Sequence, residues 1–125
     1  MASSQNTSPP SSLKLSMSRR DTQLLIEDIL EAANRILTYT RDLSFEDFTA
    51  DQKTVDAVAR NFEIIGEAAS RLPEEFKSKH PDINWIRITG LRNRIIHEYF
   101  GVDYSLVWKI KLDYIPHLIS ALEKI

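Results

Sequence analysis

One short stretch of the sequence, residues 92–99 (RNRIIHEY), gathers most of the side chains that could do chemistry. Arg92 offers a planar set of donors that can hold a phosphate through two parallel hydrogen bonds, and it stays charged at any ordinary pH. His97 can exchange a proton near neutral pH, which suits general acid–base catalysis. Asn93 could orient the imidazole or bind a phosphate oxygen.

Together these side chains would be enough to cleave RNA without a metal ion. His97 would act on the ribose 2′-hydroxyl or on the leaving oxygen, while Arg92 would stabilise the charge that develops on phosphorus. The products of such a cleavage are a 2′,3′-cyclic phosphate and a free 5′-hydroxyl. The spacing alone does not require this chemistry, because an arginine and a histidine on one helix are commonplace. The adjacent Glu98 favours the alternative, a surface salt bridge.

The local charge around this stretch suits a phosphate. Three arginines and no acidic residue lie between Trp85 and His97, namely Arg87, Arg92 and Arg94. The whole chain has a net charge of −2, so it is not a generally basic protein that coats nucleic acid. Any phosphate must therefore bind a local basic patch, and Arg87 and Arg94 are candidate RNA contacts within it.

The composition is that of one globular domain. The chain has 125 residues, 42% of them hydrophobic and 27% charged, and it has no cysteine for a disulfide or a thiolate site. No apolar run approaches the roughly 18 residues that a membrane helix needs. Residues 1–18 are rich in serine and lack the apolar core of a secretory signal. We expect a disordered tail at 1–18, a helical domain at 19–125, a cytoplasmic location and no membrane partner.

Apolar residues recur at intervals of three and four through most of the chain, which indicates amphipathic helices. We expect long helices at about 21–40, 51–72, 85–100 and 104–122, and a short one at 73–79. The first stripe comprises Leu24, Leu25, Ile29, Ala33, Ile36 and Leu37. Residues 42–50 break the pattern and predict a connecting loop whose rings, Phe45 and Phe48, cover the bundle end. No segment shows sustained strand alternation, so the fold class is all-α, an up-and-down bundle of four to five helices.

A few residues predict the details of these helices. Gly66 lies inside the second helix, where glycine costs about 1 kcal/mol relative to alanine, so we expect another backbone to approach it closely. Gly101 would cap the C-terminus of the third long helix. Asp103 or Ser105 would cap the last helix, and Pro116 should kink it.

The third long helix does not by itself bring Arg92 and His97 together. They lie ~140° apart around a helix axis, whereas Tyr99 shares the core face with Ile95. His97 would lie in the last turn, where the helix dipole favours a protonated imidazole. The two side chains would meet if Arg92 reached around the helix or if a second copy crossed it. We therefore expect a symmetric homodimer with Arg92 and His97 in a groove at the two-fold interface, and Tyr99 at its edge.

The order of arginine, four residues, histidine, one residue and tyrosine resembles the motif of the HEPN superfamily. Further segments narrow the resemblance to the HepT-like branch: Phe62-Glu63-Ile64-Ile65-Gly66-Glu67-Ala68, Trp85, Gly90-Leu91-Arg92-Asn93, and Tyr99-Phe100-Gly101-Val102-Asp103 running on to Trp108. The resemblance covers about residues 19–122, nearly the whole expected domain.

This resemblance implies an α-helical homodimer whose cleft is lined by the arginine and histidine of both motifs. It implies a metal-independent endoribonuclease, the toxin of a type II toxin–antitoxin system, that acts on an RNA such as tRNA or mRNA. The antitoxin would be an MntA-like nucleotidyltransferase that attaches AMP to the motif tyrosine. By the same resemblance, Arg92 and His97 are catalytic, Asn93 assists them, and Tyr99 is modified. Weaker candidates are Arg60 as an RNA contact and Asn61, Glu63 and Glu67 as parts of the cleft wall.

Other interpretations of the same residues stay open. The chain could be a non-catalytic helical module that docks on a nucleotidyltransferase and is modified by it, or a bundle that binds a nucleotide. Tyr99 could pack in the core with its hydroxyl at the rim. Trp85 and Trp108 are expected as core or interface anchors. His80 and His117 have no partner at ligand spacing, and the sequence predicts neither a metal site nor a cofactor.

Overall fold

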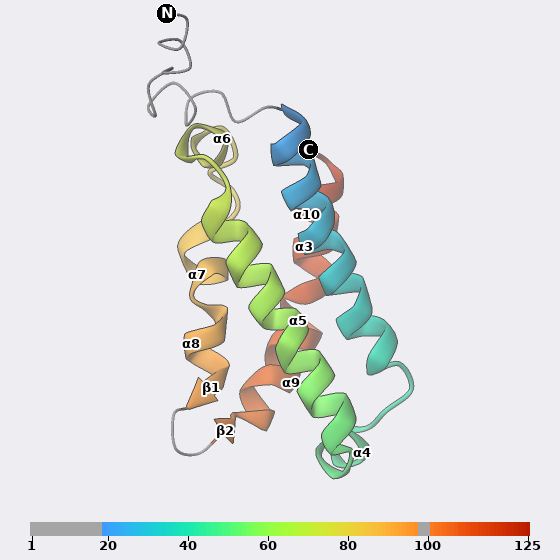
Figure 1. Cartoon of the computed structure of the whole chain (residues 1–125). Coiled ribbons are helices and arrows are strands. Elements are labelled where there is room, and N and C mark those ends of the chain that lie inside the picture. Colours follow the sequence, from blue (N-terminus) through green and yellow to red (C-terminus); the bar gives the residue numbers. More distant parts are fainter. Residues whose placement is uncertain (1–18, 98–100) are drawn as a thin grey trace, which may run out of the picture.

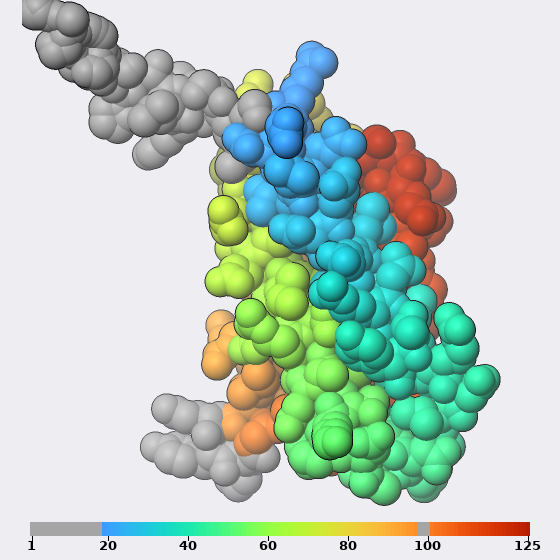
Figure 2. Space-filling model, turned by 45° about the vertical axis from the view of Figure 1, so that its right-hand side comes forward, coloured from blue at the N-terminus to red at the C-terminus, as the bar shows by residue number. Residues whose placement is uncertain are grey.

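Two long antiparallel helices, α3 (Arg19–Tyr39) and α5 (Gln52–Arg71), run side by side through the structure (Figures 1 and 2). This computed structural model describes residues 19–97 and 101–125. Each long helix buries one apolar stripe, as the spacing predicts, and Figure 1 shows the chain going down α3 and back up α5. Leu24, which the pattern assigned to the stripe of α3, is 46% exposed, so that assignment is wrong and Ile26 is buried instead.

The segment between these helices is itself partly helical. We predicted a loop at 42–50, but α4 occupies Phe45–Ala50. Its cap explains the difference: the Ser44 side chain accepts a hydrogen bond from the Asp47 backbone N–H, and Asp47 accepts one from the Ser44 N–H. The expected role of the rings is confirmed, because Phe48 is fully buried with its ring centroid 5.1 Å from that of Trp108.

A glycine in α5 allows the next part of the chain to approach closely. A Cβ atom on Gly66 would lie 3.3 Å from the carbonyl oxygens of Ile88 and Thr89, so the predicted backbone approach is confirmed. After α5, Pro73 precedes the short helix α6 (Glu74–Ser78), as expected. The approaching carbonyls belong to α7 (Trp85–Thr89), whose first turn is capped by the Asn84 side chain.

The predicted long helix at 85–100 is wrong. Helix α7 ends at Thr89, α8 runs only from Leu91 to Ile95, and the chain then becomes extended as β1 (Ile96–His97). Strand β1 pairs antiparallel with β2 (Gly101–Val102), with Ile96 opposite Val102. Gly101 therefore does not cap a helix; its φ of +76° belongs to the return of this hairpin. Two successive β-branched residues, Ile95 and Ile96, fit the change from helix to strand.

The last part of the chain forms α9 (Tyr104–Asp113) and α10 (Ile115–Glu123). Of the two predicted caps, Asp103 and Ser105, it is Asp103 that caps α9. The expected kinked helix is two helices joined at Tyr114, because Pro116 lacks an N–H and falls in the first turn of the second. Across the described residues the fold is thus all-α and up-and-down, with eight helices and one pair of two-residue strands.

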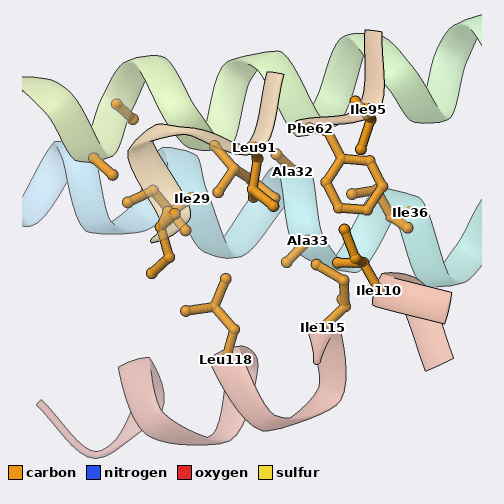
Figure 3. Close-up of a cluster of buried hydrophobic side chains, with 14 of the residues drawn as sticks. Ile29, Ala32, Ala33, Ile36, Phe62, Leu91, Ile95, Ile110, Ile115 and Leu118 are labelled. Atoms are coloured by element: carbon orange, nitrogen blue, oxygen red, sulfur yellow. The ribbon is translucent and has the colours of Figure 1, made fainter. Parts of the chain in front are cut away.

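The core lies where these helices meet. Figure 3 shows side chains from α3, α5, α8, α9 and α10 converging: Ile29, Ala32, Ala33, Ile36, Phe62, Leu91, Ile95, Ile110, Ile115 and Leu118. Leu91 and Ile95 are fully buried, and they anchor the short helix that carries Arg92. None of the helices in the described ranges is both long and apolar enough to cross a membrane.

Candidate active site

Arg92 extends from α8 toward α5 and forms an ion pair there. Its Nε atom donates a hydrogen bond to Oε2 of Glu63 at 2.6 Å, and the other oxygen of Glu63 lies 3.8 Å from Nη1 of Arg60. Glu63 thus lies between two arginines. Its side chain is 26% exposed and that of Arg92 is 57% exposed, so the pair lies at the surface, where a ligand can reach it.

The close approach at Gly66 explains why these side chains meet. Gly66 comes one turn after Glu63 and lets the backbone of α7 lie against α5. The two helices and α8 enclose an open groove of about 320 Å³. The lining residues are Arg60, Glu63, Gly66, Glu67, Ser70, Thr89, Arg92 and Asn93. Five of the predicted site residues therefore share one groove: Arg60, Glu63, Glu67, Arg92 and Asn93.

His97 lies beyond this groove, in strand β1. Its side chain is 49% exposed, and its Nε2 atom lies 4.0 Å from Oδ2 of Asp103, the residue that caps α9. Because β1 is not helical, the predicted separation of ~140° from Arg92 and the predicted effect of the helix dipole on His97 do not apply. Within residues 19–97 and 101–125, no hydrogen bond or ion pair joins Arg92 to His97.

The other two arginines of the basic stretch, Arg87 and Arg94, lie away from the groove that holds Arg92. The guanidinium of Arg87 lies 5.5 Å from the ring centroid of Tyr114, at the junction of α9 and α10. Burial raises the pKa of the Tyr114 phenol, and the positive charge of Arg87 opposes this rise. Arg94 is partly buried, and its Nη1 atom is enclosed without a hydrogen-bond partner among the described residues. Neither arginine lines the groove that holds Arg92.

Asn61 does not line this groove either. It is 5% exposed, and its side-chain nitrogen donates to the Ala57 carbonyl oxygen at 2.8 Å, within α5 itself. Residues two positions apart on a helix lie ~200° apart around its axis, so Asn61 and Glu63 project from nearly opposite sides of α5. Tyr99, the predicted site of modification, and Glu98 lie outside the described residues.

A larger groove, of about 780 Å³, lies near the start of α3, α6 and the end of α10. It is at the opposite end of the bundle from the β1–β2 pair (Figure 1). Its lining includes Arg19, Gln23, Phe76 and Lys79 but no histidine. Its size does not make it the better candidate, because its lining includes none of the motif residues Arg92, Asn93 and His97.

Asp103 is the residue that sequence reasoning missed at this site. The sequence identified it as a candidate helix cap and as part of the segment that resembles the HepT-like branch, but not as a neighbour of His97, because a helix through residue 100 would have separated the two. The extended backbone at Ile96 and the return at Gly101 bring its carboxylate toward the imidazole instead. The sequence signal for this change is the pair of β-branched residues, Ile95 and Ile96, before His97. The same pair also fits the core stripe of a helix, so it does not decide between a helix and a strand at His97.

Comparison with known proteins gives one consistent result. A family model described as "Ribonuclease HepT-like" matches residues 29–125. A protein of Thermococcus cleftensis named "Probable ribonuclease HepT" is 44% identical over 107 residues, which cover 86% of this chain and 97% of that protein. A protein of Methanocaldococcus jannaschii, named as a candidate RNase, is 39% identical over 109 residues and covers 87% of this chain and 90% of its own length. No solved structure matches the chain.

Proposed function

Because this chain belongs to the HepT-like ribonuclease family, we propose that it cleaves RNA by transesterification without a metal ion, with Arg92 and His97 as its catalytic residues. The ribose 2′-oxygen forms a bond to phosphorus, and the bond from phosphorus to the 5′-oxygen breaks. His97 takes the proton from the 2′-hydroxyl or gives one to the leaving oxygen. The products are a 2′,3′-cyclic phosphate and a 5′-hydroxyl.

The observation that carries this proposal is the way Glu63 holds Arg92. Glu63 uses only the Nε atom, and within the described part of the chain no hydrogen bond is made by either Nη atom of Arg92. The edge that bears both Nη atoms offers two parallel donors, which is the geometry that a phosphate accepts. Asn93 lines the same groove and can bind a further phosphate oxygen.

We place the reaction in a cleft between two copies of the chain. Within one copy, the exposed side chains of Arg92 and His97 contact different residues, Glu63 and Asp103, and not each other. A second copy of the chain is the simplest way to bring an arginine and a histidine of the motif together. A two-fold axis would place the Arg92 of one protomer near the His97 of its partner.

Mixing two inactive variants tests this arrangement. Arg92→Ala and His97→Ala should each abolish cleavage and leave the dimer intact in light scattering. If each site combines Arg92 of one protomer with His97 of the other, a re-equilibrated equal mixture contains one intact site in each mixed dimer. The mixture should then recover about a quarter of wild-type activity, because about half of the dimers are mixed and each has one of two sites. No recovery, with mixed dimers demonstrated, would place both groups in one protomer.

The biological role that we propose is a toxin of a type II toxin–antitoxin system, acting in the cytoplasm. An MntA-like nucleotidyltransferase would neutralise it by attaching AMP to Tyr99, one of the three residues that connect His97 to Gly101. Mass spectrometry after co-expression should find AMP on Tyr99 and none on a Tyr99→Phe variant. Growth inhibition should disappear with His97→Ala; full toxicity of that variant would overturn the catalytic assignment.

Cleavage of purified RNA separates an enzyme from a binding module. The enzyme should cut RNA in the presence of a chelator and leave a cyclic phosphate, and His97→Ala should not. If no RNA is cut by the wild type, yet the protein binds and is modified by a nucleotidyltransferase, the chain is the non-catalytic module instead.

A further inference from the structure

Asp103 connects three parts of the candidate site. Its Oδ1 atom accepts a hydrogen bond from the Leu106 backbone N–H at 3.1 Å, which caps α9. Its own N–H donates to the Ile95 carbonyl oxygen at 2.6 Å, at the end of α8. Its second carboxylate oxygen, Oδ2, lies 4.0 Å from Nε2 of His97. One residue therefore fixes the end of α8, the start of α9 and the surroundings of the imidazole.

The two side chains are held by independent restraints. The cap orients the carboxylate of Asp103, because Oδ1 is committed to Leu106 and Oδ2 must then project on the other side. The pairing of β1 with β2 fixes the backbone of His97 opposite Gly101. The separation of 4.0 Å is at the outer limit for an ion pair. A direct hydrogen bond requires Nε2 and Oδ2 to come closer by about 1 Å, and the half-exposed imidazole is the side chain with room to move.

We propose that Asp103 is the positioning residue for His97 in the ribonuclease reaction, an inference that rests on the proposed function. An ionised carboxylate only accepts hydrogen bonds, so it selects the neutral imidazole tautomer with its proton on Nε2. The lone pair then lies on Nδ1, which takes the proton of the 2′-hydroxyl as the 2′-oxygen attacks phosphorus. When His97 is charged, Nδ1 gives its proton to the leaving 5′-oxygen and the carboxylate stabilises the imidazolium.

Asp103→Asn separates this role from the cap. Asparagine caps a helix about as well as aspartate, so its Oδ1 keeps the bond from Leu106 and α9 stays capped. Its NH₂ group then replaces Oδ2 and presents a donor to Nε2. A donor at this place requires a lone pair on Nε2, which forces the proton of the neutral ring onto Nδ1 and removes the base from the substrate side.

The chain offers a matched control at another cap. Asp51 caps α5 by accepting from the Thr54 N–H at 3.2 Å, and its second oxygen accepts from the Thr54 hydroxyl rather than facing a histidine. Asp51→Asn makes the same exchange of an oxygen for an NH₂ group at a helix N-terminus. It should leave RNA cleavage unchanged. A second variant, Asp103→Ser, keeps a capping oxygen and removes the carboxylate without presenting a donor to Nε2.

Two measurements decide the inference. For Asp103→Asn we expect kcat to fall about ten- to a hundredfold, which is at or below the lower end of the roughly 10²–10⁴-fold that a general acid–base group contributes, with KM unchanged. The kcat of Asp103→Ser should also fall. In ¹⁵N spectra of histidine-labelled protein, the neutral His97 should bear its proton on Nε2 in the wild type and on Nδ1 in Asp103→Asn. The resonances of His97, one of three histidines, are assigned by their loss in His97→Gln.

The inference is overturned if kcat of Asp103→Asn stays within about twofold of wild type, or if the His97 tautomer is the same in both proteins. Its failure is distinguishable from failure of the proposed function. If His97→Ala cleaves RNA as well as the wild type, the proposed function is wrong, and an unchanged tautomer would refute the positioning role without any reference to RNA.

Discussion

Replacing Glu63 by glutamine should make RNA bind more tightly. In the wild type, Nε of Arg92 donates a hydrogen bond to Glu63 at 2.6 Å. Glutamine is close in size to glutamate, and its side-chain carbonyl oxygen can still accept this hydrogen bond. What disappears is a negative charge beside the position proposed for a phosphodiester. Glu63 thus has two opposed effects, since it orients the arginine and also repels the ligand of that arginine.

The magnitude follows from the exposure of the pair. Two unit charges about 4 Å apart interact by roughly 1 kcal/mol in water, and by more where solvent is excluded. Glu63 is 26% exposed and Arg92 57% exposed, so the value for water is the better guide. One kcal/mol corresponds to about a fivefold change in affinity, so Kd for RNA should fall about three- to tenfold. The loss of the ion pair itself should cost at most about 1 kcal/mol of folding stability.

The assay is single-turnover cleavage of a labelled RNA with a titration of enzyme, at two salt concentrations. The effect should be larger at low salt, because exposed charges are screened. Glu67→Gln is the matched control: it lines the same groove and removes the same charge, but Glu67 makes no ion pair among the described residues. If Glu63→Gln weakens RNA binding, or if Glu67→Gln strengthens it equally, the specific repulsion at Arg92 is refuted.

Three further predictions concern the fold. Gly66→Val should destabilise the protein by about 2–3 kcal/mol in urea unfolding, because even a Cβ would lie 3.3 Å from two carbonyl oxygens of α7. Phe48→Ala should cost about 3–5 kcal/mol, because the ring is fully buried against Trp108. Stability should fall as pH rises above 10, the ordinary pKa of tyrosine, since burial raises the pKa of Tyr114 and the folded state resists its ionisation. Tyr114→Phe should remove this part of the alkaline loss, measured by urea unfolding at pH 9 and 11.

Each of these has a control and a contrary outcome. Ser70→Val places a β-branched residue at an exposed position one turn beyond Gly66. If it lowers the free energy of unfolding as much as Gly66→Val does, steric contact at Gly66 is not the cause of the destabilisation. Phe45→Ala should cost less than Phe48→Ala, since Phe45 is only partly buried. An identical alkaline profile for Tyr114→Phe and wild type would assign the loss above pH 10 to other groups.

The long helices were predictable because their sequences agree at every level. In α5 the cap Asp51, the stripe from Val55 to Leu72 and the stop at Pro73 all indicate the same element. Gly66 also predicted the close approach of another backbone, because a glycine inside a strongly amphipathic helix destabilises that helix unless a neighbouring segment requires the space. Local pattern was enough where the apolar period ran for several turns.

The site was less predictable because it depends on a change of backbone within the motif. Ile95 and Ile96 fit a helical stripe as well as a strand, so the spacing favoured a helix that continues past His97. The pairing of Ile96 with Val102 is a contact between separate segments, and no local pattern specifies it. The residue types of the site were therefore predictable, whereas the neighbours of His97 were not. Arg92 shows the same limit, since its partner Glu63 lies 29 positions away.

The burial of Leu91 and Ile95 has a consequence for motion. Their side chains lie in the layer between α3, α5 and the last two helices (Figure 3), so we expect that α8 cannot open without disrupting the core. Backbone amides of α8 should then exchange with deuterium only through the rare openings that unfold the whole domain, whereas amides near the ends of the bundle should exchange sooner. If so, the backbone beneath Arg92 and Asn93 acts as a rigid support, and we expect the adjustments to a bound RNA to come from side chains, which reorient in nanoseconds or less when exposed.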